Sequence, residues 1–459
     1  MNSFDTIVAR ATPAGKGAIA VVRVSGPGAF AMVDGLLKNK ISLKNSHTAY
    51  LRQFFDADGM IDEALVLLFK GTKSYTGEDT VEISVHGSDY IVNRLITALL
   101  LQGCRVAEPG EFTQRAFLNG KLDLAQAEAV ADIIAAEHRF AHDQALKQLR
   151  GGFSDDILSL RDRLLHFTSL IELELDFGEE DVEFASREEL THLVQNIKLK
   201  VDALKDSFAL GNALKQGFTL VLAGRPNAGK STLFNALLNE DKAIVSDIAG
   251  TTRDSIEDRL FIEGLSLRLI DTAGIREATD VIEQQGIART FKHIEMSGAT
   301  LYIFEAGTLS VTELETDLQE LSSKTDRIWV VANKMDSFLG DIGQYSDVVA
   351  RETQLPMWQI SARNRLSVLQ FTKELAKRFE IDLGILDDQT VVTNARHANS
   401  LLHCSQELQH ILDGISNNLT GDLLSFHLRS AIGALSAITG EIDNEEVLGN
   451  IFSKFCIGK

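Results

Sequence analysis

The sequence predicts a multidomain protein of α/β and α class. It has an α+β N-terminal domain, a helical domain, and a doubly wound α/β domain inserted into the helical one. One observation is length, because 459 residues hold about three domains of roughly 150 residues each. The other is periodicity, which changes from mixed to helical, then to alternating strand and helix, and back to helical. The predicted segments are 1–120, 121–216, 217–380 and 381–459.

The first 120 residues combine short strand patterns with one helix pattern. Apolar or alternating runs bounded by glycine predict strands at residues 6–9, 18–24, 64–69 and 80–85. Helical spacing over residues 90–101, closed by Gly103, predicts a helix. This combination favours a compact α+β domain.

Apolar residues return at helical spacing from Leu122 onward. The pattern predicts helices over residues 122–140, 153–171 and 188–210, and the acidic stretch 172–183 is interpreted as a solvated helix end and loop. After residue 390 the chain is helical again, with predicted core positions Leu401, Leu408, Leu412, Leu423, Leu424 and Ile432. The simplest interpretation is that both helical blocks form one domain.

A phosphate-binding pattern follows the apolar run 218–223. Residues 224–231 read Gly-Arg-Pro-Asn-Ala-Gly-Lys-Ser, which fits G-x-x-x-x-G-K-S/T. In this pattern backbone N–H groups wrap a polyphosphate, the lysine reaches the terminal phosphates and the serine hydroxyl ligates Mg²⁺. Alone, the pattern could also be a coincidental glycine turn. The predicted nucleotide contacts here are Asn227, Ala228, Gly229, Lys230, Ser231 and Thr232.

Two further elements would surround the γ-phosphate and the metal. Asp271, Thr272, Ala273 and Gly274 end the strand predicted at 265–270, where the aspartate can hold a magnesium-bound water. In the preceding loop, one hydroxyl of Gly250-Thr251-Thr252 can complete the metal shell. The predicted Mg²⁺ ligands are Ser231 and one of these two threonines, with Thr252 as the candidate.

The last two elements would select the base. Asn333, Lys334, Met335 and Asp336 end the strand predicted at 328–332, and the Asp336 carboxylate suits the two N–H donors on guanine's edge, which adenine lacks. Leaving such a carboxylate unpaired would discriminate by about 10⁴-fold. Ser361, Ala362 and Arg363 follow the strand predicted at 357–360. Five elements in this order predict a GTP-hydrolysing enzyme with a Ras-like domain.

Two requirements of hydrolysis are not met in the usual way. Ile275 stands where many small GTPases carry a water-orienting glutamine, so Glu283, Gln284 and Gln285 are the polar candidates. The alternative for Glu283 is an exposed helix residue. For the missing positive charge, Asn227 with the carbonyls of residues 246–251 could seat a monovalent cation. The candidates for an arginine finger are Arg225, Arg253 and Arg276.

Composition argues against several other classes. The 45 Lys and Arg against 65 Asp and Glu leave a charge of −20, which disfavours a surface that coats nucleic acid or anionic membrane. Cys104, Cys404 and Cys456 are too few and too scattered for a disulfide framework or a zinc cluster. No secretory signal is visible, and no apolar run reaches the ~18 residues of a membrane span. We expect a cytoplasmic protein without membrane association.

Over nearly its whole length, the chain resembles the MnmE (TrmE) family of tRNA uridine-5-carboxymethylaminomethyl modification GTPases. The α/β segment shares the phosphate-binding pattern and residues 247–254. The more specific matches lie outside it, at residues 5–9, 76–79, 109–113, 115–128 and 455–459, the last ending in Cys-Ile-Gly-Lys.

This resemblance implies that the N-terminal domain dimerises and binds 5-formyl- or 5,10-methylene-tetrahydrofolate. Arg23, Glu82, Lys121 and Lys459 match the family's folate contacts. The cations can meet folate carboxylates, and Glu82 can accept from pterin N–H groups. Each alone would be interpreted as a surface salt bridge. Cys456 would lie near the folate, as a catalytic nucleophile or as an inert core cysteine.

The resemblance also implies K⁺-dependent dimerisation of the α/β domains. Asn227, Ser246, Ile248 and Thr251 would surround the cation, and Glu283 would orient the attacking water. Ser246 departs from the family's common threonine, and His86-Gly87-Ser88 departs from the usual His-Gly-Gly. The loop completes the predicted GTP contacts with Ser246, Asp247, Ile248, Ala249, Gly250, Thr251 and Thr252.

In the family the homodimeric GTPase pairs with a subunit of the MnmG (GidA) type, which uses FAD and NADH, in a heterotetramer or larger complex. Together they add a carboxymethylaminomethyl or aminomethyl group to carbon 5 of the wobble uridine of certain tRNAs. The competing interpretation is a ribosome-assembly or RNA-binding regulatory GTPase without modification chemistry. The acidic charge and the lack of an identifiable RNA-binding module weaken it.

Overall fold

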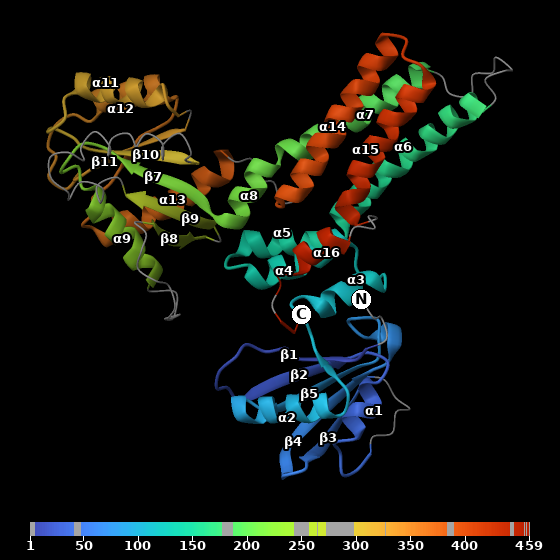
Figure 1. Ribbon diagram of the computed structural model, residues 1–459. Helices are drawn as coiled ribbons and strands as arrows, with labels where there is room; N and C mark the ends of the chain where they lie inside the picture. The colour runs from blue at the N-terminus through green and yellow to red at the C-terminus, as the bar shows by residue number, and fades with distance from the viewer. Residues whose placement is uncertain are drawn as a thin grey trace, which may run out of the picture. The chain divides into compact units, whose positions relative to one another are not determined.

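The computed structural model describes residues 5–40, 47–176, 187–242, 257–263, 265–271, 298–325, 327–382, 390–440, 445–453, 455, 457 and 458. The chain divides into two compact units (Figure 1). One unit comprises Met1–Ala135, Ala145–Ile197 and His403–Lys459, and the other comprises Ala136–Gln144 and Lys198–Leu402. The predicted multidomain α/β and α class is confirmed.

The first unit begins with a six-stranded sheet in the order β3-β4-β5-β2-β1-β6. β1 pairs in parallel with β6, and the other neighbours are antiparallel. The strands are β1 (Ile7–Arg10), β2 (Ile19–Ser25), β3 (Thr48–Asp56), β4 (Gly59–Phe69), β5 (Thr80–His86) and β6 (Arg105–Val106). The sequence prediction missed β3, an edge strand whose residues are mostly half-buried or exposed.

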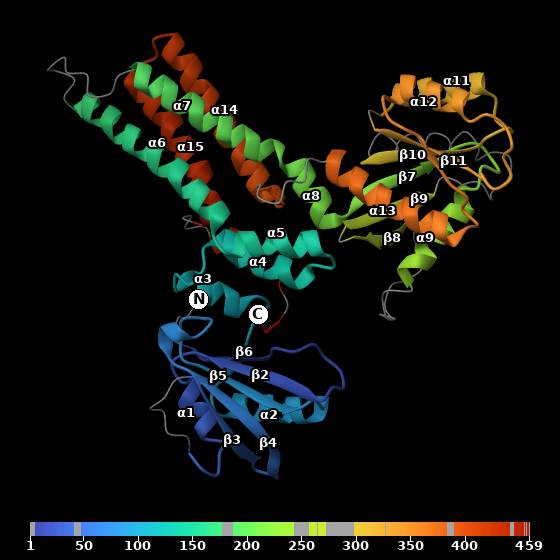
Figure 2. The same cartoon turned by 180° about the vertical axis from the view of Figure 1, so that it is seen from behind.

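Two helices cover one face of this sheet, α1 (Ala29–Asp34) and α2 (Asp89–Leu101) (Figures 1 and 2). Alternate residues of each inner strand are buried against them, such as Val22 and Val24 of β2. This is the period of two that a strand with one covered face requires.

Helices from both ends of the chain form the rest of this unit. In Figures 1 and 2, α6 lies alongside α15, and the two pack together. The helices of this part, some shared with the second unit, are α3 (Glu111–Leu118), α4 (Leu124–Ala135), α5 (Arg139–Leu149), α6 (Gly152–Asp176), α7 (Arg187–Asp206), α14 (Ala395–Ser416), α15 (Gly421–Thr439) and α16 (Glu445–Phe452).

Two details of the helical prediction are wrong. The predicted helix 122–140 is interrupted between α4 and α5, where His138 Nδ1 accepts from the Ala141 N–H at 3.3 Å and so caps the start of α5. Leu423 is 50% exposed, whereas Leu424 is buried. Adjacent helical residues point to different faces, so only one of the two leucines reaches the core.

The second unit is a doubly wound α/β domain, as predicted, with strand order β12-β11-β10-β7-β9-β8. β8 and β9 are antiparallel, and the other neighbours are parallel. The carboxyl ends of the parallel strands therefore lie at one edge. The strands are β7 (Phe218–Ala223), β8 (Glu257–Ile262), β9 (Leu265–Asp271), β10 (Ala299–Glu305), β11 (Ile328–Asn333) and β12 (Trp358–Gln359).

Helices cover both faces of the second sheet. α9 (Lys230–Lys242) and α13 (Arg365–Asp382) pack on one face, and α11 (Val311–Ser322) and α12 (Gly343–Thr353) pack on the other. α8 (Phe208–Gln216) precedes the first strand. In the described part of the chain, no helix has the length and hydrophobicity that a bilayer span requires.

Candidate functional site

The turn between β7 and α9 forms a tight loop at residues 224–230, the phosphate loop. A Cβ on Gly224 would lie 2.1 Å from the Ile303 carbonyl oxygen, so only glycine fits there. The buried Lys230 Nζ donates to the carbonyls of Gly224 at 2.7 Å and Arg225 at 2.9 Å. The lysine therefore lies across the loop, beside the N-terminus of α9, where the helix dipole favours an anion.

Asn333, at the end of β11, joins three loops of the site. Its Nδ2 donates to the Ala228 carbonyl at 2.9 Å, and its Oδ1 accepts from the Ala362 N–H at 2.9 Å. The side chain is 1% exposed, and a Cβ on Gly229 would lie 2.2 Å from its Nδ2. The predicted phosphate loop and base-selecting elements thus share one buried amide.

The base-selecting loop carries an exposed carboxylate and a fixed lysine. The pKa of Asp336 is lowered, first by a hydrogen bond from the Ser361 side chain and further by the positive charge of Arg363. Lys334 has φ +61° and pairs with Glu305 at 2.5 Å, while the Met335 N–H donates to the Ile360 carbonyl at 3.1 Å. The structure therefore brings together the predicted residues of 333–336 and 361–363.

The predicted metal and catalytic residues are only partly described. Ser231 opens α9 with an exposed side chain, next to the phosphate loop, and its hydroxyl is a suitable hard ligand for Mg²⁺. Asn227 is exposed with φ +64°. The Asp271 backbone lies opposite Leu222 of β7, which places the end of β9 beside the phosphate loop. Outside the described residues lie Ser246, Asp247, Ile248, Ala249, Gly250, Thr251, Thr252, Arg253, Thr272, Ala273, Gly274, Arg276 and Glu283.

Arg225 of the phosphate loop contacts helix α11. Its Nε and Nη2 donate to the two Asp317 carboxylate oxygens at 2.9 and 3.0 Å, and its Nη1 donates to Glu313 at 2.6 Å. The pKa of Arg225 is raised by these hydrogen bonds, and the bonds to Asp317 make the largest contribution. Sequence reasoning named Arg225 only as a finger candidate, since periodicity does not reveal such partners.

In the first unit, two of the predicted folate contacts are paired with each other. Arg23 and Glu82 are directly opposite in the β2–β5 register, and Arg23 Nε donates to Glu82 Oε1 at 2.9 Å. The Arg23 guanidinium also lies 5.4 Å from the ring centre of Tyr75 and 5.6 Å from that of Phe112. Phe112 is fully buried and Tyr75 is half-buried, so of these two rings only that of Tyr75 could meet a planar pterin ring.

Of the remaining folate candidates, Lys121 belongs to the described part of the chain. Lys121 Nζ donates to the Thr72 carbonyl at 2.7 Å, while Cys456 and Lys459 lie outside the described residues. Gly458 is described: its carbonyl accepts from Arg23 at 3.5 Å, so the C-terminal tail reaches the N-terminal sheet. The sequence prediction missed Tyr75, although Phe112 falls within the specific segment 109–113.

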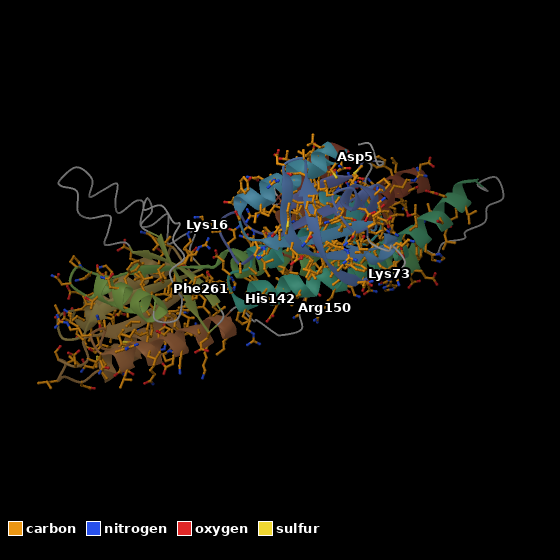
Figure 3. All side chains as sticks on the ribbon, turned by 90° about the horizontal axis from the view of Figure 1, so that it is seen from below. Asp5, Lys16, Lys73, His142, Arg150 and Phe261 are labelled. Atoms are coloured by element: carbon orange, nitrogen blue, oxygen red, sulfur yellow. The ribbon has the colours of Figure 1, made fainter. Side chains whose placement is uncertain are left out.

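A charged network connects the family-specific N-terminal segments. Arg115 pairs with Asp5, Glu78 and Glu111, and Arg105 pairs with Asp5 and Glu111; Figure 3 labels Asp5. Burial by itself would raise the pKa of Glu111, but hydrogen bonds from Arg105, the Glu108 N–H and Arg115 lower it. These ion pairs therefore tie the segments that contain Asp5, Glu78, Glu111 and Arg115 to one another.

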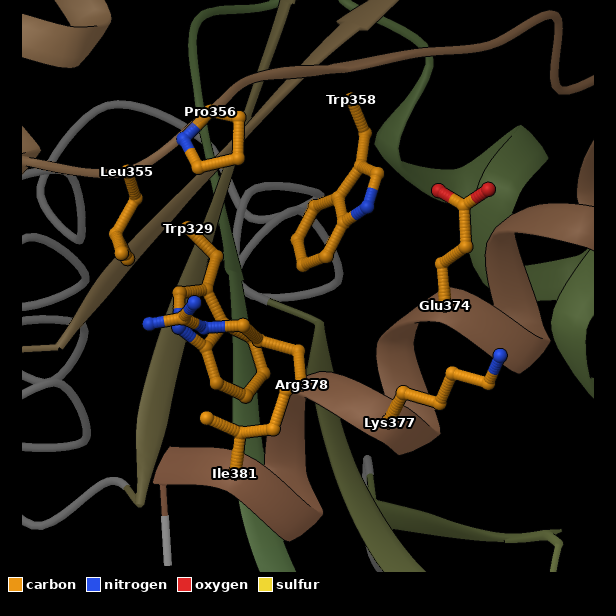
Figure 4. Close-up of a pocket in the computed structure, with 8 residues that line it drawn as sticks. All are labelled: Trp329, Leu355, Pro356, Trp358, Glu374, Lys377, Arg378 and Ile381. Carbon is orange, nitrogen blue, oxygen red and sulfur yellow. The ribbon is translucent and has the colours of Figure 1, made fainter.

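A cavity of about 180 Å³ lies away from the nucleotide loops. It is bounded by Trp329, near the amino end of β11, and by Trp358 of the edge strand β12, as Figure 4 shows. Because Asn333 is at the opposite end of β11, this cavity is separate from the phosphate loop. The other lining residues are Leu355, Pro356, Glu374, Lys377, Arg378 and Ile381.

Comparisons with known proteins cover the full chain. A family model described as the MnmE helical domain matches residues 124–456, and one described as the GTP-binding protein TrmE N-terminus matches residues 6–121. The chain is 47% identical over 468 residues to a tRNA modification GTPase MnmE of Flavobacterium johnsoniae, covering 100% of both chains. It is 47% identical over 460 residues to that of Cytophaga hutchinsonii, covering 100% of this chain and 98% of that one. A third relative, from Flavobacterium psychrophilum, is 46% identical over 469 residues, again covering 100% of both chains.

Proposed function

The chain belongs to the tRNA modification GTPase MnmE family, and on this premise we propose that the loops around Asn333 form its GTP site. It is a GTP-hydrolysing enzyme that acts in tRNA wobble modification. The observation that supports the site is the Asn333 side chain, which binds both the phosphate loop and the Ser361–Arg363 loop. One amide thus couples the phosphate end of the nucleotide to its base end.

Each described residue has a role that suits its position. The phosphate loop and Lys230 bind the phosphates at the N-terminus of α9. Asp336 accepts from guanine, and its lowered pKa keeps it ionised at neutral pH. Ser231, with Thr252, holds Mg²⁺, which neutralises charge between the terminal phosphates when bound.

For hydrolysis, Glu283 would orient the attacking water. Asn227, Ser246, Ile248 and Thr251 would hold K⁺, which would supply the positive charge of an arginine finger as the G domains dimerise. Asn227 supports this because it is exposed within the phosphate loop, in a left-handed conformation with φ +64°. K⁺ should accelerate GTP hydrolysis well beyond Na⁺, because Na⁺ is smaller than K⁺ and should fit the loop poorly. Equal rates in the two salts would contradict the cation site, and normal turnover of Glu283→Ala would contradict the role of Glu283.

The N-terminal sheet binds 5-formyl- or 5,10-methylene-tetrahydrofolate through Arg23, Glu82, Lys121 and Lys459, with Cys456 nearby as a candidate nucleophile. The Arg23–Glu82 pair beside the half-buried Tyr75 supports this assignment, since it combines a cation, an acceptor and an aromatic ring.

The modification itself is the addition of a carboxymethylaminomethyl or aminomethyl group to carbon 5 of the wobble uridine. The chain acts as a homodimer, in the cytoplasm, with an FAD- and NADH-dependent partner of the MnmG type. Its four segments, 1–120, 121–216, 217–380 and 381–459, are the folate-binding, helical, G and second helical parts. Because the charge is −20, the partner supplies most of the basic surface for tRNA.

The decisive experiment is mass spectrometry of tRNA nucleosides from cells that lack this gene, with and without a plasmid copy. We expect the carbon-5 modification to disappear and the plasmid to restore it. A plasmid encoding Lys230→Ala should fail to restore it, which ties the chemistry to GTP. If the modification persists without the gene, a ribosome-assembly role becomes the better reading, and subunit profiles would test it.

A further inference from the structure

We propose that Arg225 is a positioning residue that holds the phosphate loop against helix α11, so that the loop is preformed when nucleotide binds. This inference rests on the proposed GTP site. It assigns a task to Glu313, Asp317 and Tyr302 of β10 and α11, none of which belongs to a nucleotide-binding motif.

Two carboxylates of α11 hold the Arg225 guanidinium. Asp317 binds its guanidinium through two parallel hydrogen bonds, and Glu313 binds the third nitrogen. Bidentate arginine–carboxylate pairs fix orientation as well as distance. All three donating nitrogens therefore have carboxylate partners on α11, which an arginine finger directed at the γ-phosphate would have to leave.

The carboxylates of Glu313 and Asp317 are themselves held by neighbouring groups. Glu313 forms a capping box with Ser310, accepting from its N–H at 3.0 Å and from its hydroxyl at 2.7 Å. These bonds and the one from Arg225 lower the pKa of Glu313 to about 2. Asp317 accepts a hydrogen bond from the Tyr302 hydroxyl, and the Tyr302 ring is buried between β10 and α11. Arg225 is thus attached to the packed core of the domain.

The Arg225 backbone is in turn bonded to Lys230 of the phosphate loop. The Arg225 carbonyl accepts from Lys230 Nζ at 2.9 Å and from the Ala228 N–H at 3.4 Å. Moving the Arg225 backbone would therefore displace the lysine and the loop together. The contacts run in one chain from Tyr302 through Asp317 and Arg225 to Lys230.

The test uses the full chain and fluorescent GDP, with Asp317→Asn, Arg225→Ala and Tyr302→Phe as variants. An intact loop slows the dissociation of nucleotide. We therefore expect Asp317→Asn and Arg225→Ala to raise the GDP dissociation rate about fivefold, which corresponds to the free energy that a partly exposed charge pair contributes. Tyr302→Phe, which keeps the ring, should raise it about twofold. The turnover number of Asp317→Asn and Tyr302→Phe at saturating GTP should stay within about twofold, because both side chains lie outside the phosphate loop on α11 and β10.

Glu315→Gln is the matched control. Glu315 also lies on α11 and pairs with an arginine, Arg351 of α12, at 2.5 Å, but that pair does not reach the phosphate loop. The GDP dissociation rate of the Glu315→Gln variant should equal that of the unmodified chain.

Two results would overturn the proposal. One is a normal dissociation rate in both Asp317→Asn and Tyr302→Phe, and these two variants keep the test valid if Arg225→Ala fails to fold. The other is a tenfold loss of turnover in Arg225→Ala at unchanged dissociation, which would make Arg225 a finger. Lys230→Ala separates the premise from the inference, since normal GDP affinity in that variant would refute the GTP site itself.

Discussion

Replacing Asn333 by alanine should weaken both the fold of the second unit and its affinity for GTP. The substitution removes the hydrogen bonds to the Ala228 carbonyl and from the Ala362 N–H, each 2.9 Å long. Ala228 and Ala362 are 4% and 7% exposed, so water has little access to the groups left behind. The loss therefore includes two unsatisfied buried groups as well as two bonds.

The magnitude follows from the burial of those groups. A buried polar group left without its partner costs about 1–3 kcal/mol, and two of them give about 2–4 kcal/mol after partial relaxation. For a unit of about 200 residues, each kcal/mol lowers the unfolding midpoint by about 2–4 °C. The midpoint should fall by at least about 4 °C.

Tryptophan fluorescence measures this unit selectively. The chain has two tryptophans, and both Trp329 and Trp358 lie in the second unit. Thermal unfolding followed by their emission therefore reports the unit that holds Asn333, without a contribution from the other. Fluorescent GDP titration of the folded variant gives the affinity at the same time.

The matched control is Asn235→Ala, the same substitution at an exposed position of α9. It should change the free energy of unfolding by less than about 0.5 kcal/mol, since exposed sites contribute little. If Asn333→Ala unfolds like the control and binds GDP normally, the buried amide does not couple the loops and the reasoning fails.

Three further predictions concern the first unit. Glu82→Gln should weaken tetrahydrofolate binding at least about tenfold by calorimetry, because a charged acceptor is lost, whereas Glu63→Gln on the exposed side of β4 should not. Burial raises the pKa of the Cys104 thiol to about 11. Iodoacetamide at pH 8 should therefore leave Cys104 unmodified until urea is added, as mass spectrometry would show. Rapid labelling of the native chain would contradict the burial of this thiol. The pKa of Glu111 lies below its ordinary 4.5 in the folded chain, so its stabilisation is complete above about pH 4.5 and is lost as pH falls through the lowered value. Circular dichroism should show a smaller acid-induced loss of stability in Glu111→Gln, and an identical pH profile would exclude Glu111 as the cause.

Much of the fold could be predicted because each helix, strand and loop depends on a short stretch of sequence. The phosphate loop, the strands around it and the base-selecting residues follow from short patterns whose chemistry requires them at strand ends. The contacts that join these patterns were not predictable. Asn333 was assigned to base selection, yet its side chain lies against Ala228, 105 residues earlier in the chain. The spacing of apolar residues along the chain does not predict a contact over that separation.

The N-terminal domain shows the same limit. Pairing of Arg23 with Glu82 depends on the register of β2 and β5, which the hydrophobic pattern of each strand alone leaves open. Likewise, the interruption at residue 138 depends on a histidine acting as a cap, a role that serine, threonine, aspartate and asparagine usually fill.

The contact between Gly458 and the first strands has a consequence for the order of folding during synthesis. The first unit needs residues 403–459, whereas the second is complete at Leu402. At about 5–20 residues per second, synthesis of the second unit is finished roughly 3–11 s before that of the first. During that interval α6 lacks α15, and its apolar side has no native partner from that helix. A nascent chain stalled before residue 421 should therefore bind nucleotide and still be a substrate for chaperones.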